Sequence, residues 1–152
     1  MTILVTGGAG YIGSHTCIEL LNSGHQVLVL DNLCNSKHES LIRVERITDK
    51  KIIFVQGDVR DADCLQRIFQ KQSIKAVIHF AGLKAVGESC KRPLAYYENN
   101  VMGSLILVQQ MKKAGIKSLV FSSSATVYGD PEKLPLTEGM PLSATNPMGA
   151  VN

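Results

Sequence analysis

The stretch that decides the fold is Thr6-Gly7-Gly8-Ala9-Gly10-Tyr11-Ile12-Gly13. It follows the β-branched run 2–6 and precedes residues 11–23, whose apolar side chains recur with helical spacing. Both Gly-x-x-Gly-x-x-Gly and Gly-x-Gly-x-x-Gly occur within it. Glycine permits a tight turn and lets the backbone approach a pyrophosphate, and a helix N-terminus offers unpaired N–H groups. The stretch therefore predicts a dinucleotide-binding turn, the alternative being a glycine-rich turn without a ligand.

Outward from this turn, short β-branched runs alternate with segments of helical period. The expected strands cover residues 2–6, 26–30, 51–56, 76–80 and 118–122, and the expected helices cover residues 11–23, 39–48, 62–72 and 93–114. Residues 128–152 hold four of the five prolines, and we expect a loop there. This pattern predicts the α/β class, with a Rossmann-type doubly wound parallel sheet that is truncated after about strand five.

Composition excludes several other classes of protein. With 152 residues, 45% hydrophobic and 19% charged, the chain suits one globular domain. No apolar run reaches the roughly 20 residues of a membrane span, and the start lacks a basic signal region, so we expect no membrane partner and a cytoplasmic location. The net charge of +3 comes from dispersed lysines, which argues against nucleic-acid binding. Four scattered cysteines predict reduced structural thiols and no metal site.

An acidic residue lies where this fold places a ribose acceptor. Asp31 follows the second expected strand, 18 residues beyond Gly13. A carboxylate there repels a 2′-phosphate, and residues 32–34 supply no arginine, so NAD is favoured over NADP. The alternative is an aspartate that only caps the next turn. Asp58, after the third expected strand, is a candidate for the adenine edge or an ordinary turn residue.

Four further stretches of the sequence point to a particular family of proteins. They are Asp31-Asn32-Leu33-Cys34-Asn35-Ser36, residues 80–89 (Phe-Ala-Gly-Leu-Lys-Ala-Val-Gly-Glu-Ser), residues 97–101 (Tyr-Glu-Asn-Asn-Val) and residues 122–129 (Ser-Ser-Ser-Ala-Thr-Val-Tyr-Gly). Together they resemble the UDP-glucose 4-epimerase family, within the NAD-dependent epimerase/dehydratases of the extended short-chain dehydrogenase/reductase type. The resemblance covers residues 1 to about 147. Sugar-nucleotide dehydratases resemble the chain less, because they carry an acidic pair where this sequence has Ala125-Thr126.

The resemblance implies bound NAD and the interconversion of UDP-glucose and UDP-galactose through a 4-keto intermediate. It implies a UDP-sugar substrate and homodimers for intact relatives. The cofactor would be contacted by Gly7, Gly10, Tyr11, Ile12, Gly13, Asp31, Asn32, Asn35, Ser36, Asp58, Val59, Phe80, Ala81, Gly82, Lys84 and Asn99. Ser124 would be catalytic and share a hydrogen bond with the reacting hydroxyl. From residue chemistry alone, Ser124 could equally be a structural hydroxyl at a strand end, Lys84 a solvated charge and His79 a packed strand residue.

The family's Tyr-x-x-x-Lys motif is replaced in this chain. Met148 stands where the tyrosine would take a proton, and Asn152 stands where the lysine would lower that tyrosine's pKa. We therefore expect residues 1–152 to be an incomplete NAD-binding Rossmann domain, inactive alone, with the C-terminal UDP-sugar-binding domain absent. The alternatives are a non-catalytic NAD-binding module and a fragment of a sugar-nucleotide dehydratase.

A single-base deletion would explain residues 148–152. The motif Tyr-Gly-Arg-Ser-Lys can be encoded as TAT GGG CGC AGT AAA. Without its first base the same sequence reads ATG GGC GCA GTA AA, which encodes Met-Gly-Ala-Val and, with T or C next, Asn. We expect a frameshift after Pro147 followed by an early stop codon, the alternatives being an engineered truncation or divergence.

Overall fold

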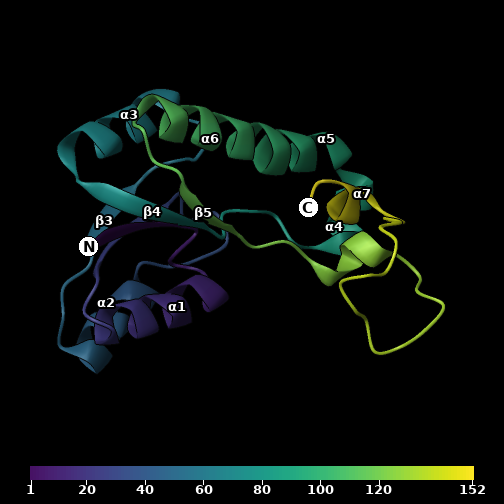
Figure 1. The fold of residues 1–152 in the computed structure, drawn as a ribbon, viewed down its shortest axis with the longest axis horizontal. Helices are drawn as coiled ribbons and strands as arrows, with labels where there is room; N and C mark the ends of the chain where they lie inside the picture. Colours follow the sequence, from purple (N-terminus) through teal and green to yellow (C-terminus); the bar gives the residue numbers. More distant parts are fainter. The chain divides into compact units, whose positions relative to one another are not determined.

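The computed structural model describes residues 1–152 as two compact units. Unit 1 comprises residues 1–81 and 105–122, and unit 2 comprises residues 82–104 and 123–152. Unit 1 contains a five-stranded parallel sheet in the order β3-β2-β1-β4-β5 (Figure 1). Its strands are β1 (Thr2–Thr6), β2 (Gln26–Asp31), β3 (Ile53–Gln56), β4 (Ile74–His79) and β5 (Ser118–Phe121). Its helices are α1 (Tyr11–Asn22), α2 (Glu39–Thr48), α3 (Ala62–Lys71) and most of α6 (Gly103–Lys113).

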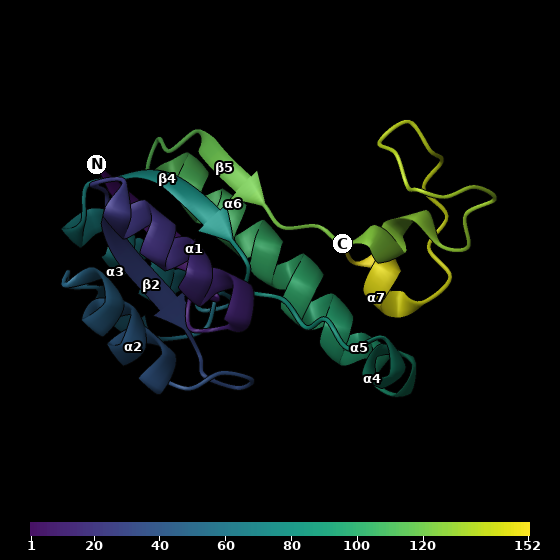
Figure 2. The ribbon, with the colours of Figure 1, turned by 90° about the horizontal axis from the view of Figure 1, so that it is seen from below.

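Helices cover both faces of this sheet, as the doubly wound prediction requires. Figures 1 and 2 show α1 and α2 on one face and α3 and α6 on the other. Alternate residues of β1 point to opposite faces: Ile3 and Val5 pack with α1 and α2, whereas Leu4 packs with α3 and α6. Each fully buried aliphatic side chain contributes about 1.5–3 kcal/mol to folding. The two apolar layers thus hold the strand ends that carry the candidate site.

The expected element boundaries are mostly confirmed. Helix α1 ends at Asn22 and is followed by Gly24 at a φ of +81°, and the Asp61 side chain caps α3 by accepting from two backbone N–H groups. Strand β3 begins two residues later than expected, since the Ile52 N–H donates to the Glu45 side chain. Strand β4 begins two residues earlier, because Ile74 pairs with Thr2.

Unit 2 contains short helices: α4 (Val86–Lys91), α5 (Pro93–Tyr96), the π-helix η1 (Tyr97–Met102), the 3-10 helix η2 (Ala125–Tyr128), α7 (Pro147–Ala150) and the first two residues of α6. The expected helix over residues 93–114 is a continuous helical run over residues 93–113 with a π segment inside it.

The expected loop over residues 128–152 is wrong at residues 147–150. There the Asn146 side chain accepts from the Gly149 N–H and Pro147 occupies the first turn of α7. The core of unit 2 is Tyr96, Met148 and Val151.

None of the helices combines the length and apolar character that crossing a membrane requires. All four cysteines are free thiols, of which Cys17 and Cys64 are buried and Cys34 and Cys90 are exposed.

Candidate functional site

The glycine turn follows β1 and packs closely against the end of β4. Gly7 has a φ of +69°, and a Cβ there would lie 2.6 Å from the Ala81 nitrogen and 2.8 Å from the Phe80 carbonyl carbon. A Cβ on Gly13 would collide with the Gly7 carbonyl oxygen. Neither position therefore has room for a side chain, so the turn requires glycine at both.

Helix α1 begins at this turn with Gly10 as its N-cap, and no side chain caps it. Tyr11 and Ile12 are exposed, with 82% and 60% of their surface accessible. Because the first N–H groups of a helix have no intrahelical partner, an uncapped N-terminus beside a glycine turn suits an anion.

Asp31 ties the glycine turn to the loop after β2. Its Oδ2 accepts from the Ala9 N–H at 2.9 Å, and its Oδ1 accepts from the Leu33 N–H and the Ser36 hydroxyl, each at 2.9 Å. A carboxylate offers about four acceptor positions, so these three donors leave one on Oδ2. Asp31 therefore fixes the local backbone and retains capacity for a hydroxyl of a ligand. Cys34 and Asn35, in the same loop, are exposed.

Asp58, after β3, is bound by donors from two neighbours. Its Oδ1 accepts from the backbone N–H and Nε of Arg60, both at 2.9 Å, and its Oδ2 accepts from Arg60 Nη2 at 2.7 Å and Asn32 Nδ2 at 3.0 Å. Hydrogen bonding by Arg60 holds the pKa of the Asp58 carboxyl well below its usual range, against an opposing effect of burial. The Val59 side chain lies in the core, so only its backbone is available at the edge of the sheet.

A buried hydrogen bond joins the ends of β1 and β4. The Thr6 hydroxyl and Nδ1 of His79 lie 2.6 Å apart, and both residues are almost fully buried. The interpretation of His79 as a packed strand residue is confirmed. Strands β1 and β4 are the neighbours at which the chain reverses its direction across the sheet, and open α/β sheets bind ligands at the carboxyl ends of such strands.

Unit 2 links Ser124 to Met148 through the side chain of Thr126. Ser124 caps η2, and its Oγ lies 2.9 Å from the Thr126 hydroxyl, which in turn donates to the Met148 sulfur at 3.3 Å. Asn152 Nδ2 donates to the Met148 carbonyl oxygen at 2.5 Å, and Lys84 Nζ donates to Asn152 Oδ1. A thioether carries no proton that it could exchange, so residue 148 cannot act as an acid or a base.

The remaining predicted residues of unit 2 lie on or near its π-helix. Asn99 is in η1, and its Nδ2 donates to Oδ1 of Asn100 at 2.9 Å. Asn100 also accepts from the Leu83 N–H and donates to the Leu83 carbonyl, which fixes the backbone that follows Gly82. Single π turns often occur at functional sites.

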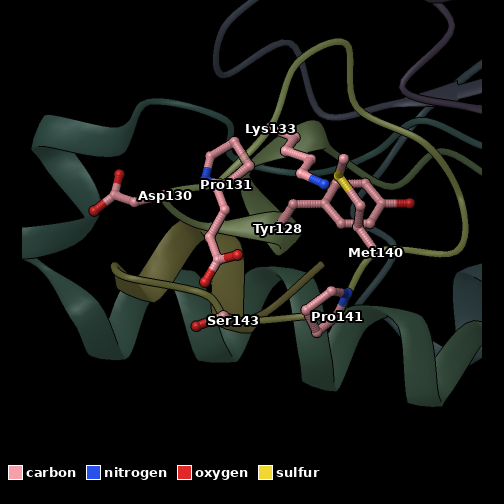
Figure 3. A pocket seen from close by; sticks show the side chains of 8 residues that line it. Tyr128, Asp130, Pro131, Lys133, Met140, Pro141 and Ser143 are labelled. Carbon is pink, nitrogen blue, oxygen red and sulfur yellow. The ribbon is translucent and has the colours of Figure 1, made fainter.

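A separate hollow of about 430 Å³ lies in unit 2 and contains none of the predicted site residues. It is lined by Tyr128, Asp130, Pro131, Glu132, Lys133, Met140, Pro141 and Ser143 (Figure 3). In Figure 3 the Asp130 carboxylate points away from the Tyr128 ring, so the charged groups do not converge on one point.

Sequence reasoning missed Arg60, Thr6 and the contact between Ser89 and residue 148, in which the Met148 N–H donates to Ser89 Oγ at 3.2 Å. The Asp-Val-Arg sequence at residues 58–60 was the available signal for Arg60, because an arginine two residues after an aspartate can bend back to it. The other two pairs are 73 and 59 residues apart, and no local pattern reports them.

Comparison with known proteins agrees with this geometry. The profile of the NAD dependent epimerase/dehydratase family matches residues 3–150. The chain belongs to this family.

Within the family, the chain is similar to UDP-glucose 4-epimerases. It is 63% identical to that of Pasteurella multocida over 98% of this chain and 44% of the relative, and 60% identical to that of Bacillus subtilis with the same coverage. The crystal structure of UDP-glucose 4-epimerase from Bifidobacterium longum, in complex with NAD⁺ and UDP, matches with a TM-score of 0.97 and 53% identity. That match covers 99% of this chain and 45% of the other. The chain thus spans less than half the length of these relatives.

Proposed function

We propose that unit 1 binds NAD and that the chain corresponds to the dinucleotide-binding part of a UDP-glucose 4-epimerase. The observation that carries this proposal is the glycine turn, in which Gly7 packs against the backbone of Phe80 and Ala81 while Asp31 holds Ala9. This arrangement leaves a backbone surface without side chains beside an uncapped helix N-terminus. A pyrophosphate suits that surface, and the residual acceptor on Asp31 suits a ribose hydroxyl.

The residues present fit NAD better than NADP. The Asp31 carboxylate is buried, and a 2′-phosphate beside it would place two negative charges together. The guanidinium of Arg60, which shares Asp58 as a partner with Asn32, is already paired with that carboxylate. We assign the adenine base to the region of Asp58, because β3 and β2 are adjacent strands and the base is attached to the ribose that Asp31 would bind.

The chemistry of the family supports a role for unit 2 in proton transfer. When bound, NAD⁺ supplies a hydride acceptor for the carbon that is oxidised. Ser124 would hydrogen-bond the hydroxyl on that carbon, and a residue at position 148 would remove its proton. Met148 cannot do so, and Asn152 brings no charge to help it. We infer that the chain alone binds the cofactor without epimerising UDP-glucose.

Other expectations from the resemblance stay predictions. They are the cofactor contacts of Gly82, Lys84 and Asn99, the UDP-sugar substrate and homodimeric assembly of whole relatives, and the cytoplasmic location. The alternative function is a non-catalytic NAD-binding module. Such a module would bind NAD with the same affinity but would take no part in a reaction of UDP-sugars.

Two measurements on the purified chain test the proposal. Isothermal titration should show saturable binding of one NAD⁺ per chain, and an assay for UDP-galactose should detect no product from UDP-glucose. The control is Arg43→Met, which removes only an exposed ion pair on α2 and should leave NAD⁺ binding unchanged. Absence of NAD⁺ binding, or turnover by the chain alone, would show that the proposal is wrong.

A further inference from the structure

Asp58 and Asp31 differ in how many hydrogen bonds they can still accept. Three donors of the chain occupy Asp31, and four occupy Asp58. Because a carboxylate has about four acceptor positions, Asp58 is saturated by the protein itself. A base that approaches Asp58 can donate a hydrogen bond to this carboxylate only if one of these donors leaves.

The donors to Asp58 are not equally easy to displace. The backbone N–H of Arg60 is fixed by the chain, and the Asn32 side chain is also anchored through its Oδ1, which accepts from the Cys34 N–H at 3.0 Å. The guanidinium of Arg60 supplies the other two hydrogen bonds from a side chain that is 43% exposed. The pair is bidentate and therefore stronger than an ordinary surface ion pair, but it can separate by rotation of the Arg60 side chain, without any movement of the backbone.

We propose that Arg60 is an internal competitor for the base: its guanidinium occupies Asp58 in the free chain and withdraws when a purine with an exocyclic amine binds. This inference rests on the proposed binding of NAD. Adenine offers such an amine, and its N–H replaces the guanidinium donor at the carboxylate. Hypoxanthine offers a carbonyl oxygen at the same position, which a carboxylate repels, so it gains nothing from the withdrawal of Arg60. Arg60 therefore lowers the affinity for the adenine dinucleotide. It also makes the difference in affinity between the adenine and hypoxanthine dinucleotides smaller.

The test compares NAD⁺ with nicotinamide hypoxanthine dinucleotide on the full chain. Arg60→Met keeps the aliphatic stem and removes the guanidinium. The matched control is Arg43→Met, which removes the exposed Arg43–Glu39 pair on α2. A third variant, Asp58→Asn/Arg60→Met, removes the carboxylate as well. Affinities are measured by titration calorimetry, and urea denaturation records the stability of each variant.

Arg60→Met should bind NAD⁺ at least about fivefold more tightly than the unmodified chain, because the bidentate pair that must otherwise be broken contributes more than an ordinary exposed ion pair. Its affinity for the hypoxanthine dinucleotide should fall, because the carboxylate that repels the carbonyl oxygen is no longer paired, and the gain for NAD⁺ should vanish in the double variant. Arg43→Met should match the unmodified chain for both ligands. Unchanged or weaker NAD⁺ binding by Arg60→Met, or an equal gain for both ligands, would overturn the role of Arg60 alone. Failure of the unmodified chain and every variant to bind NAD⁺ would overturn the proposed function and this inference with it.

Discussion

The backbone N–H of Ala9 donates to Oδ2 of Asp31 at 2.9 Å, across 22 residues of sequence. This bond joins the turn after β1 to the end of β2, so the two parts of the candidate site are held by one carboxylate. Asp31 fixes the backbone of both parts and is also the acceptor that we propose for a ribose hydroxyl. Its loss should affect folding and binding at once.

The close approach at Gly7 predicts a large and position-specific cost for a side chain. Gly7→Ala adds both a strained positive φ and a contact with the backbone of Ala81, whereas Gly115→Ala adds only the strain, since nothing lies within 4 Å of its Cβ position. We expect Gly115→Ala to lower the free energy of unfolding by about 1 kcal/mol and Gly7→Ala by about 3 kcal/mol. Urea denaturation of both variants measures the difference. Equal losses would mean that the turn does not pack against β4.

The buried thiol of Cys17 predicts a loss of stability in alkali. Burial raises the pKa of the Cys17 thiol to about 12, well above the ordinary value for a thiol. The folded state therefore disfavours the thiolate, and this contribution to stability is complete below pH 9 and falls as the pH rises toward 12. The free energy of unfolding should decrease over this range, and Cys17→Ala should decrease less. A variant with the same alkaline slope as the unmodified chain would contradict this assignment.

Strand β5 forms an apolar edge of the sheet, which predicts self-association. All four of its residues are exposed, including Val120 at 61%, and a groove of about 280 Å³ lies beside Leu119. Unpaired strand edges are templates for pairing with other chains. Val120→Lys should reduce association in concentration-dependent light scattering. Leu134→Lys adds the same charge to the exposed loop of unit 2 and should have little effect. Similar behaviour of the two variants would argue for a general charge effect.

The residues at 148–152 predict a second reading frame in the gene. If one base was lost after the codon for Pro147, the alternative frame should encode Tyr-Gly-Arg-Ser-Lys at these positions and continue as the second half of an epimerase. Restoring the base should then restore interconversion of UDP-glucose and UDP-galactose. Sequencing of the genomic region tests the frameshift, because an alternative frame that does not continue as the second half of an epimerase would exclude it.

The sequence predicted the features that depend on local spacing. The glycine turn and Asp31 follow from short patterns, and the structure places both at the expected element ends. The saturation of Asp58 was not predictable, because it depends on Asn32 in the neighbouring strand's loop as well as on Arg60. Helix α7 was overlooked although Asn146-Pro147 is a typical N-cap and first-turn pair, because so short a helix shows no period.

The contacts of Tyr96 illustrate the other limit of sequence reasoning. Its ring is fully buried beside Met148, and its hydroxyl donates to the Ala85 carbonyl at 2.8 Å. In the sequence it is one of two adjacent tyrosines, and only the tertiary fold of unit 2 distinguishes it from Tyr97, which is exposed. Burial of one residue of such a pair depends on packing that a helical period does not resolve.

Displacement of bound NADH from the unmodified chain and from Asp31→Asn, measured by NADH fluorescence, tests most directly whether Asp31 selects NAD over NADP. NAD⁺ should displace NADH from the unmodified chain at a concentration about tenfold or more below that of NADP⁺, because Asp31 would accept a ribose hydroxyl and repel a 2′-phosphate. In Asp31→Asn the two concentrations should converge, since the charge is gone. Equal displacement by NAD⁺ and NADP⁺ in the unmodified chain, or no NADH binding at all, would show that Asp31 does not select NAD in this chain.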